Sequence, residues 1–206
     1  MKSSIPRKTL YRLSLYLRCL QRLHDNGIRT VSSEALAKVA GVSPTQLRKD
    51  LTYFGHFGTR GLGYDVELLA ITLRDTLGTN RLQPVIVIGV GSLGSALMSY
   101  PGFAKEGFEI VAGFDEDIRR KRGKNFHQPI FQMNKLAAFI RRRRVKLAIL
   151  AVPAAAAQEA ANRLLEAGIA GILNFAPIVL DVPDTIAVNN VNLAIELENL
   201  AYFVKA

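Results

Sequence analysis

The sequence is poor in cysteine and lacks tryptophan and any long apolar run. Its single cysteine, Cys19, has no partner for an internal disulfide, so we expect a small buried side chain there. No apolar stretch approaches the roughly 18 to 20 residues that span a bilayer, and arginines interrupt the amino terminus before a signal-peptide core forms. The sequence therefore predicts a cytoplasmic protein.

Acidic residues are also scarce. The 206-residue chain contains 27 Lys and Arg against 17 Asp and Glu, a net charge of +10, and its 49% of hydrophobic residues exclude a disordered chain. Residues 1–80 contain 12 basic and 6 acidic side chains, so the excess is densest there. This balance favours an anionic partner. Two later basic runs, 119–124 and 141–144, are typical of solvated helix faces.

The amino-terminal quarter has the pattern of a helix-turn-helix. Apolar residues recur at three- and four-residue steps over 7–25, which predicts an amphipathic helix. A short helix follows with Ser32 or Ser33 as its cap, and a glycine turn leads to a third helix. Ser43 is the expected N-cap of that helix, and Gln46 is placed to complete a capping box.

The third helix has an apolar side for the core and a polar side for a ligand. At about 100° per residue, its leucines gather on one side. The opposite side is cationic and hydroxylated, which suits phosphates and base edges in a major groove, although any surface helix has a polar side. It carries Thr45, Arg48, Lys49 and Thr52.

A glycine-rich segment over 55–64 strengthens the DNA-binding interpretation. Its four glycines surround Arg60, and this predicts a hairpin or wing whose tip approaches a nucleic-acid backbone or enters a minor groove. A further amphipathic helix is predicted over 66–77, and 78–80 has the composition of a linker.

The second half begins with a dinucleotide-binding pattern. An apolar strand over 85–88 leads into Gly89, Gly91 and Gly94, which fit G-x-G-x-x-G before a helix, and a second strand ends at Asp115. The glycines would let a pyrophosphate approach the start of the helix, and Asp115 would accept hydrogen bonds from the adenosine ribose. An acid there repels a 2′-phosphate, so NAD and NADH are favoured over the phosphorylated forms, although the nearby Arg119 and Arg120 leave the phosphorylated forms open.

Strands and helices continue to alternate after this motif. Strands are predicted within 145–153, 169–177 and 185–191, with a helix over 154–167 between the first two, so we expect an α/β fold with a doubly wound parallel sheet. Ligands bind at the carboxyl ends of such strands. The apolar tail after this sheet is expected to pack on a second subunit.

No catalytic constellation accompanies the glycine loop. The three histidines, His24, His56 and His127, lack an acid at a readable spacing and are expected on the surface. The sequence therefore favours a sensor over an enzyme. Two alternatives stay open: a small NAD-dependent oxidoreductase with a basic oligomerisation domain, and a winged-helix regulator whose second domain binds another nucleotide such as a CoA ester.

Several blocks of the chain together resemble the Rex family of bacterial redox-sensing transcriptional repressors. They are SSEALAKVAGVSPTQLRKDLTYFGHFGTRGLGY, GVGSLG, SYPGF, NFAP and NLAIELENLAYF. The resemblance implies a homodimer with a winged-helix domain over 1–78, a Rossmann domain over 79–190, and a swapped terminal helix over 191–206. It also implies binding to palindromic operators and release when NADH rises relative to NAD⁺.

The resemblance and the patterns above together give roles to individual positions. Family positions match Arg48, Lys49, Arg60, the three glycines, Tyr100 and Asp115, whereas the AVP and NFAP residues are expected at the site because they lie at strand ends. The expected DNA-binding residues are Ser43, Thr45, Gln46, Arg48, Lys49, Thr52, Tyr53 and Arg60. The expected cofactor-binding residues are Gly89, Val90, Gly91, Ser92, Leu93, Gly94, Tyr100, Asp115, Val152, Pro153, Asn174 and Phe175. No metal is expected.

The resemblance also implies a switch between subunits. Arg18 matches an arginine that contacts the partner's swapped segment, and Tyr100 matches a tyrosine close to the nicotinamide. The sequence departs from the family at the start of the last helix, where Asn192 stands in place of an aspartate.

Overall fold

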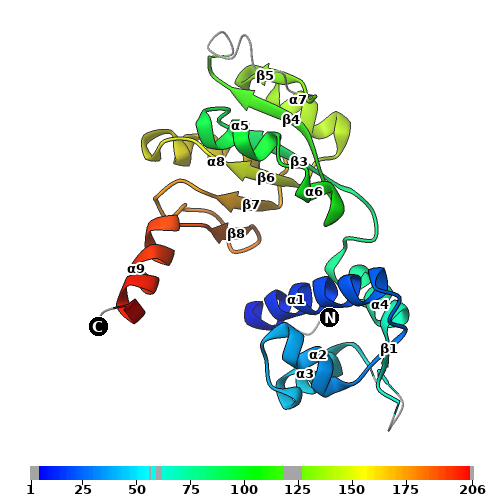
Figure 1. Ribbon diagram of the computed structural model, residues 1–206. Helices are drawn as coiled ribbons and strands as arrows, with labels where there is room; N and C mark the ends of the chain where they lie inside the picture. The colour runs from blue at the N-terminus through cyan, green and yellow to red at the C-terminus, as the bar shows by residue number, and fades with distance from the viewer. Residues whose placement is uncertain (1–4, 56, 59–61, 118–126, 205–206) are drawn as a thin grey trace. The chain divides into compact units, whose positions relative to one another are not determined.

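The computed structural model describes residues 5–55, 57–58, 62–117 and 127–204. Packing divides the chain into two compact units, residues 1–81 and 82–206. Figure 1 shows helices in the first unit and a helix-covered sheet in the second. The predicted domain boundaries after residues 78 and 190 stay predictions.

The amino-terminal unit has the helices that the sequence pattern predicts. Its helices and strands are α1 (Arg7–Asp25), β1 (Thr30–Val31), α2 (Ser33–Ala40), α3 (Pro44–Leu51), the 3-10 helix η1 (Thr52–Phe54), β2 (Tyr64–Asp65) and α4 (Val66–Leu77). Ser32 caps α2 by accepting a hydrogen bond from the Ala35 amide, and Gly41 ends that helix in the left-handed conformation with φ 69°.

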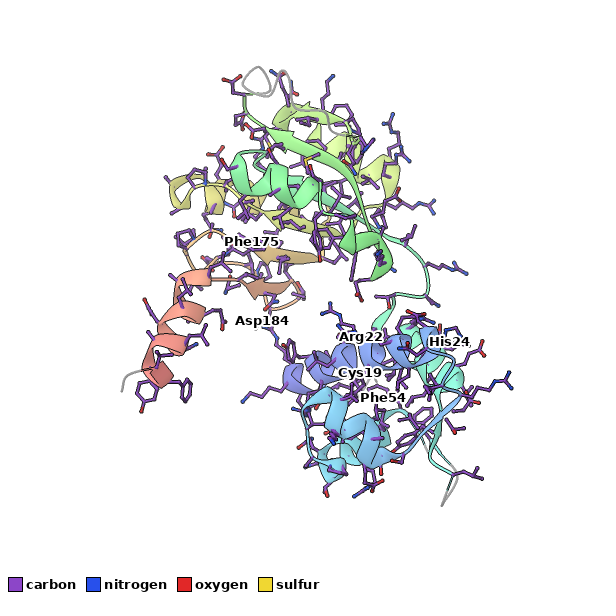
Figure 2. All side chains as sticks on the ribbon, in the orientation of Figure 1. Cys19, Arg22, His24, Phe54, Phe175 and Asp184 are labelled. Carbon is purple, nitrogen blue, oxygen red and sulfur yellow. The ribbon has the colours of Figure 1, made fainter. Side chains whose placement is uncertain are left out.

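The apolar stripes of these helices form one core. Leu13, Tyr16 and Leu20 of α1 are fully buried, and the facing leucines of the other helices pack on them. Figure 2 places Cys19 and Phe54 among these side chains, as we expected for an inert buried cysteine.

The predicted wing is described only in part. Its strand β2 pairs in antiparallel fashion with β1, which precedes α2. Residues 56 and 59–61 lie outside the described residues, and this includes Arg60 and His56.

The second unit is a six-stranded parallel sheet in the order β5-β4-β3-β6-β7-β8, which confirms the predicted doubly wound fold. Its strands are β3 (Gln83–Ile88), β4 (Phe108–Asp115), β5 (Ile130–Gln132), β6 (Leu147–Leu150), β7 (Gly171–Asn174) and β8 (Ala187–Asn190). Its helices are α5 (Ser92–Met98), α6 (Gly102–Lys105), the 3-10 helix η3 (Met133–Lys135), α7 (Leu136–Arg143), α8 (Ala154–Glu166) and α9 (Leu193–Val204).

Both faces of the sheet are buried, which explains why β3 is apolar at consecutive positions. Ile86 and Ile88 point into a core shared with α7 and α8, whereas Val85 and Val87 point to the other face with Met98 of α5. Strand order reverses at β3, because β4 lies on one side of it and β6 on the other. That reversal is where ligands bind in such sheets.

The terminal helix α9 has no buried residue. Its large apolar side chains are mostly exposed, including Leu197 at 66% and Phe203 at 82%. Figure 1 shows α9 extending from the end of the sheet beyond β8. No helix in the described part of the chain is both long and apolar enough to cross a bilayer.

Candidate functional site

The polar face predicted for α3 is exposed in the structure. Thr45, Arg48, Lys49 and Thr52 all lie on the surface, and Tyr53 in the following 3-10 helix is 42% exposed. Leu47 and Leu51 on the opposite face are buried. The helix therefore presents two cations and two hydroxyls in one direction.

The capping box predicted at the start of α3 forms only in part. Ser43 Oγ accepts a hydrogen bond from the Gln46 amide at 3.1 Å, which is half of that motif. The Gln46 side chain does not complete it: its Nε2 donates to Asp50 at 2.9 Å, one turn further along α3. The buried carboxylate of Asp50 is a stronger acceptor than the cap position offers.

Arg48 contacts α2 within the same unit. Its Nη1 donates to Ser33 Oγ at 2.9 Å and lies 3.5 Å from Glu34 Oε1. Both side chains of this ion pair are more than half exposed. Exposed pairs of this kind contribute little to stability, so the guanidinium can exchange this contact for a phosphate or a base edge at small cost.

Asp50 anchors α3 to α1, and the sequence analysis did not identify it. Its side chain is only 1% exposed. Arg12 Nε donates to Oδ2 at 2.6 Å and Arg12 Nη2 donates to Oδ1 at 2.7 Å, so the pair is bidentate. Tyr16 Oη also donates to Oδ2, at 2.8 Å. Thr9 Oγ1 donates to Oδ1 at 3.4 Å as well, so four hydrogen bonds from α1 fix α3 on the core of its unit, and Gln46 of α3 itself donates the fifth.

These contacts determine the charge state of the cluster. Burial by itself raises the pKa of Asp50, but the hydrogen bonds from Arg12, Tyr16 and Gln46 outweigh it and hold that pKa below its ordinary value. Burial and the hydrogen bond to Asp50 raise the pKa of Tyr16. Asp50 is therefore an anion, and Tyr16 a neutral donor, at physiological pH.

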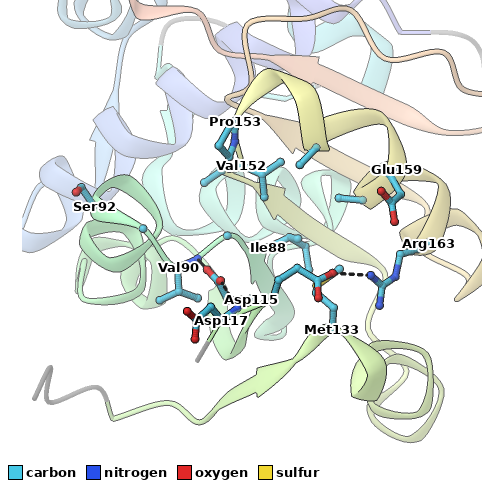
Figure 3. Close-up of a pocket in the computed structure, with 16 residues that line it drawn as sticks. Ile88, Val90, Ser92, Asp115, Asp117, Met133, Val152, Pro153, Glu159 and Arg163 are labelled. Carbon is cyan, nitrogen blue, oxygen red and sulfur yellow. Dashed lines mark hydrogen bonds and ion pairs between the residues drawn. The ribbon is translucent and has the colours of Figure 1, made fainter. Parts of the chain in front are cut away.

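A cavity of about 550 Å³ opens at the strand reversal of the second unit. It lies at the carboxyl ends of β3, β4 and β6 and against α8, as Figure 3 shows. Seven of the predicted cofactor-binding residues line it: Gly89, Val90, Gly91, Ser92, Asp115, Val152 and Pro153.

The three glycines of the loop satisfy different requirements. Gly89 has φ 85°, and a Cβ there would lie 2.6 Å from the Ala151 carbonyl oxygen. A Cβ on Gly94 would collide with the carbonyl oxygen of Gly89, so this residue permits close packing of α5 on the loop. A Cβ on Gly91 would meet nothing within 4 Å, so the space beside Gly91 stays open for a ligand.

Asp115 connects the end of β4 to the glycine loop. Its Oδ2 accepts a hydrogen bond from the Val90 amide at 2.7 Å, and its Oδ1 accepts one from the Asp117 amide at 3.0 Å. Asp115 therefore holds the glycine loop, and it also lines the pocket beside that loop.

These features fit a dinucleotide. No side chain caps the first turn of α5, the loop in front of it is open at Gly91, and an acid ends the neighbouring strand. Open space beside a glycine loop suits a pyrophosphate, and an acid at the end of the second strand suits a ribose. The described lining of the pocket therefore suits NAD or NADH.

Five predicted cofactor residues are not part of the lining: Leu93, Gly94, Tyr100, Asn174 and Phe175. Asn174 is fully buried, and its amide donates to the Ala176 and Ile178 carbonyls and to Asn190. These hydrogen bonds give Asn174 a structural role that needs no ligand. Tyr100 is 58% exposed and stacks edge-on against Phe103, with ring centroids 5.2 Å apart. Ligand contacts by these five residues stay predictions.

The pocket also contains residues that the sequence analysis missed. Glu116 and Asp117 follow Asp115 directly, so their position after the second strand was an available signal. Glu159 and Arg163 lie one turn apart on α8 and face the same cavity. Arg163 Nη1 donates to Glu116 Oε1 at 2.8 Å, and Figure 3 shows this pair across the pocket.

The predicted switch residues lie in different units. Arg18 is exposed on α1. Asn192 is the residue before α9, and its Oδ1 accepts hydrogen bonds from the Ala194 amide at 3.0 Å and the Ile195 amide at 3.3 Å. Asn192 thus stabilises the start of the apolar helix. The switch itself stays a prediction. Of the described histidines, His24 and His127 are on the surface, as expected.

Fold and site together define a class. A helix-turn-helix unit with an exposed cationic helix is joined to a Rossmann unit with a dinucleotide-type pocket, and this combination is that of a ligand-responsive DNA-binding regulator. Comparison with known proteins agrees. A family model described as "Putative DNA-binding protein N-terminus" matches residues 4–52, and one described as "CoA binding domain" matches residues 80–178.

Curated relatives give the family. The chain is 48% identical over 202 residues to the redox-sensing transcriptional repressor Rex of Carboxydothermus hydrogenoformans, covering 98% of this chain and 97% of that protein. It is 44% identical to the Rex protein of Pelotomaculum thermopropionicum, covering 96% and 93% of the two chains. The chain therefore belongs to the Rex family of redox-sensing transcriptional repressors, which are regulators and not enzymes.

Solved structures of RSP, which is described as a Rex-family repressor, agree with this assignment. The crystal structure of RSP in complex with β-NAD⁺ and operator DNA has a TM-score of 0.90 and 36% identity, covering 98% of this chain and 93% of that chain. The structure of RSP in complex with β-NADH has a TM-score of 0.86 and 34% identity, covering 98% and 95% of the two chains.

Proposed function

We propose that this protein is an NADH-responsive repressor that binds palindromic operator DNA and leaves it when NADH rises relative to NAD⁺. One observation carries the proposal: a single chain joins an exposed cationic recognition helix to an open glycine-loop pocket, as in a relative crystallised with both NAD⁺ and operator DNA. Because it acts on DNA, its place of action is the cytoplasm.

The DNA-binding step rests on α3. Arg48 and Lys49 reach phosphates or base edges, and the hydroxyls of Thr45 and Thr52 extend the same face. Ser43, Gln46, Tyr53 and Arg60 are assigned to this surface by family resemblance. The Arg12–Asp50 anchor keeps the helix orientation fixed, so less ordering is needed on binding.

The sensing step rests on the pocket. Gly91 leaves space for the pyrophosphate, and Asp115 accepts the ribose hydroxyls while it holds the Val90 amide. The nicotinamide carries the redox state that distinguishes NADH from NAD⁺. Tyr100, Arg18 and Asn192 are assigned by resemblance to the step that reports this state to the DNA-binding unit.

We infer that the protein acts as a homodimer through α9. The helix exposes apolar side chains along its length, and a palindromic operator matches a two-fold protein. We expect these apolar side chains of α9 to pack against a second copy of this chain. Light scattering is expected to give a mass of about twice the 22.6 kDa chain, and a monomer at micromolar concentration would contradict this inference.

The description of the second family model supports a test with coenzyme A as well. Operator DNA bound to the protein is titrated with NADH, NAD⁺, NADPH and CoA, and release is followed by fluorescence anisotropy. We expect NADH to release the operator at the lowest concentration. Release by CoA and by none of the other compounds would favour the alternative in which the second domain of a winged-helix regulator binds a CoA ester. Sustained oxidation of NADH would favour the alternative of an NAD-dependent oxidoreductase.

A further inference from the structure

The described lining of the pocket is acidic except at one point. Among the described residues that line it, four carry carboxylates, Asp115, Glu116, Asp117 and Glu159, and one carries a guanidinium, Arg163. Arg163 is therefore the one cation of this lining that can attract a phosphate group. Its charge is neutralised locally, because Glu116 accepts a hydrogen bond from Nη1 at 2.8 Å.

The pair joins two walls of the cavity. Glu116 follows the last residue of β4, and Arg163 lies on α8, 47 positions further along the chain. A dinucleotide with its ribose at Asp115 would have the ribose 2′ position near Glu116, because both acids line the same cavity at the carboxyl end of β4. This is the position at which NADPH carries its additional phosphate.

We propose that Glu116 is a specificity-determining residue, which excludes NADPH by occupying Arg163. This inference rests on the proposed function. Asp115 disfavours a 2′-phosphate by direct repulsion, as in other NAD-binding folds. Glu116 acts in a different way, because it removes the only described cation of the lining that could pair with that phosphate.

The pair contributes little to the fold, which makes it suitable for substitution. The Glu116 side chain is 77% exposed and that of Arg163 is 32% exposed. Ion pairs at such exposure are worth about 0–1 kcal/mol. Glu116→Gln keeps the size and one acceptor oxygen of the side chain while it releases the charge of Arg163.

The chain offers a matched control. Glu159 lines the same cavity and is exposed on the same helix as Arg163, and the described contacts of Arg163 include Glu116 and not Glu159. Glu159→Gln removes the same charge from the pocket without releasing the guanidinium. Comparison of the two variants separates a general charge effect from the effect of the pair.

Calorimetry with NADH and NADPH is performed on the parent, Glu116→Gln, Glu159→Gln and the double variant Glu116→Gln/Arg163→Gln. The measured quantity is the preference, the ratio of the NADPH to the NADH dissociation constant. We expect Glu116→Gln to lower this ratio about tenfold, because a charge-assisted contact to the 2′-phosphate becomes available. Glu159→Gln is expected to change it by about twofold or less, and the double variant to return it to the parent's value.

Equal shifts in Glu116→Gln and Glu159→Gln would overturn the inference, because then only the pocket's total charge would matter. A double variant whose ratio stays as low as that of Glu116→Gln would also overturn the inference, because Arg163 would then not be responsible for the tighter binding of NADPH. A damaged pocket would weaken both dinucleotides and leave the ratio unchanged, which is again against the inference. A parent protein that binds neither dinucleotide would contradict the proposed function itself.

Discussion

At the scale of single residues, the glycine loop shows how one motif combines folding and function. Gly89 and Gly94 are required by the backbone, since a side chain at either would strike a carbonyl oxygen. Gly91 is surrounded by open space on its Cβ side. A side chain at Gly91 therefore fills the pocket without displacing the protein's own atoms, which separates loss of ligand from loss of fold.

Asn192 permits a test of the predicted switch. In the family an aspartate at this position is expected to pair with Arg18 of the partner, and a charge-assisted hydrogen bond exceeds a neutral one by about 1 kcal/mol, or roughly fivefold. We predict that Asn192→Asp tightens operator binding without cofactor and raises the NADH needed for release by a similar factor. Operator affinity measured across NADH concentrations checks this.

The control for that variant follows from the structure. Asn192 caps α9, and aspartate and serine also cap helices well. Asn192→Ser keeps a capping oxygen and adds no charge, so we expect it not to tighten operator binding. Release curves of Asn192→Asp that superimpose on those of the parent would remove residue 192 from the switch.

Residues of the site were predictable where the signal was local. Gly91 and Asp115 follow from the spacing of one motif, and both line the pocket. Asp50 and Arg163 were missed, because their partners lie 38 and 47 positions away and no short pattern marks such pairs. The side chain of Gln46 was misassigned to the cap for a different reason: its acceptor Asp50 is only four positions away, but the burial that makes Asp50 the preferred acceptor depends on contacts with α1.

At the scale of elements, the contact between α1 and α3 predicts a pH dependence. The pKa of Asp50 is lowered in the folded protein, so its carboxylate stabilises the fold above the unfolded value of about 3.9, and this contribution is lost as pH falls through the lower folded pKa. Asp50→Asn cannot titrate. We expect the free energy of unfolding of this variant to be about 2 to 4 kcal/mol lower than that of the parent at pH 7, because Arg12 is left without its anion.

Chemical denaturation at pH 7 and at pH 3 is the measurement. The difference in free energy of unfolding between the parent and Asp50→Asn is expected to shrink at the lower pH, because there the unfolded parent binds a proton on Asp50 that the folded carboxylate binds less readily. Asp25→Asn is the matched control, because that carboxylate at the end of α1 is exposed and we expect little effect. A difference that stays the same at both pH values would be inconsistent with an ionised Asp50.

The exposed face of α3 predicts the DNA contact. Arg48→Ala/Lys49→Ala is expected to weaken operator binding by about 1 to 3 kcal/mol for each base contact that is lost. Each phosphate contact that is lost is expected to reduce the slope of log binding constant against log salt concentration by about 1. NADH binding should be unchanged. Arg142→Ala/Arg143→Ala removes the same charge from the exposed end of α7 and serves as the control. Equal loss in both double variants would mean that only net charge matters.

Element prediction succeeded where periodicity or capping was strong. The helices α1 and α4 and the strands β3 and β4 have the predicted bounds to within two residues. The strand β5 was not predicted, because three residues at a sheet edge carry no period of their own. The strand β2 pairs with β1, a two-residue strand that the sequence analysis did not predict, whereas the hairpin predicted over 55–64 lies partly outside the described residues and stays a prediction.

At the scale of the whole molecule, the chain has two units with separate cores and one apolar helix without a buried residue. Sequence patterns predicted this division because the charge, the periodicity and the motifs all change near residue 80. A ligand shifts a regulator only by its different affinity for the two functional states. The central claim is therefore that occupancy of the glycine-loop pocket controls DNA binding by the other unit.

The most direct test compares the parent with Gly91→Val in one experiment. Both proteins are bound to operator DNA, and NADH is added while DNA release is recorded. The account predicts that both bind the operator equally well without cofactor, that NADH releases the parent, and that Gly91→Val stays bound because its side chain fills the open space of the loop. Release of Gly91→Val at the parent's NADH concentration would contradict the account.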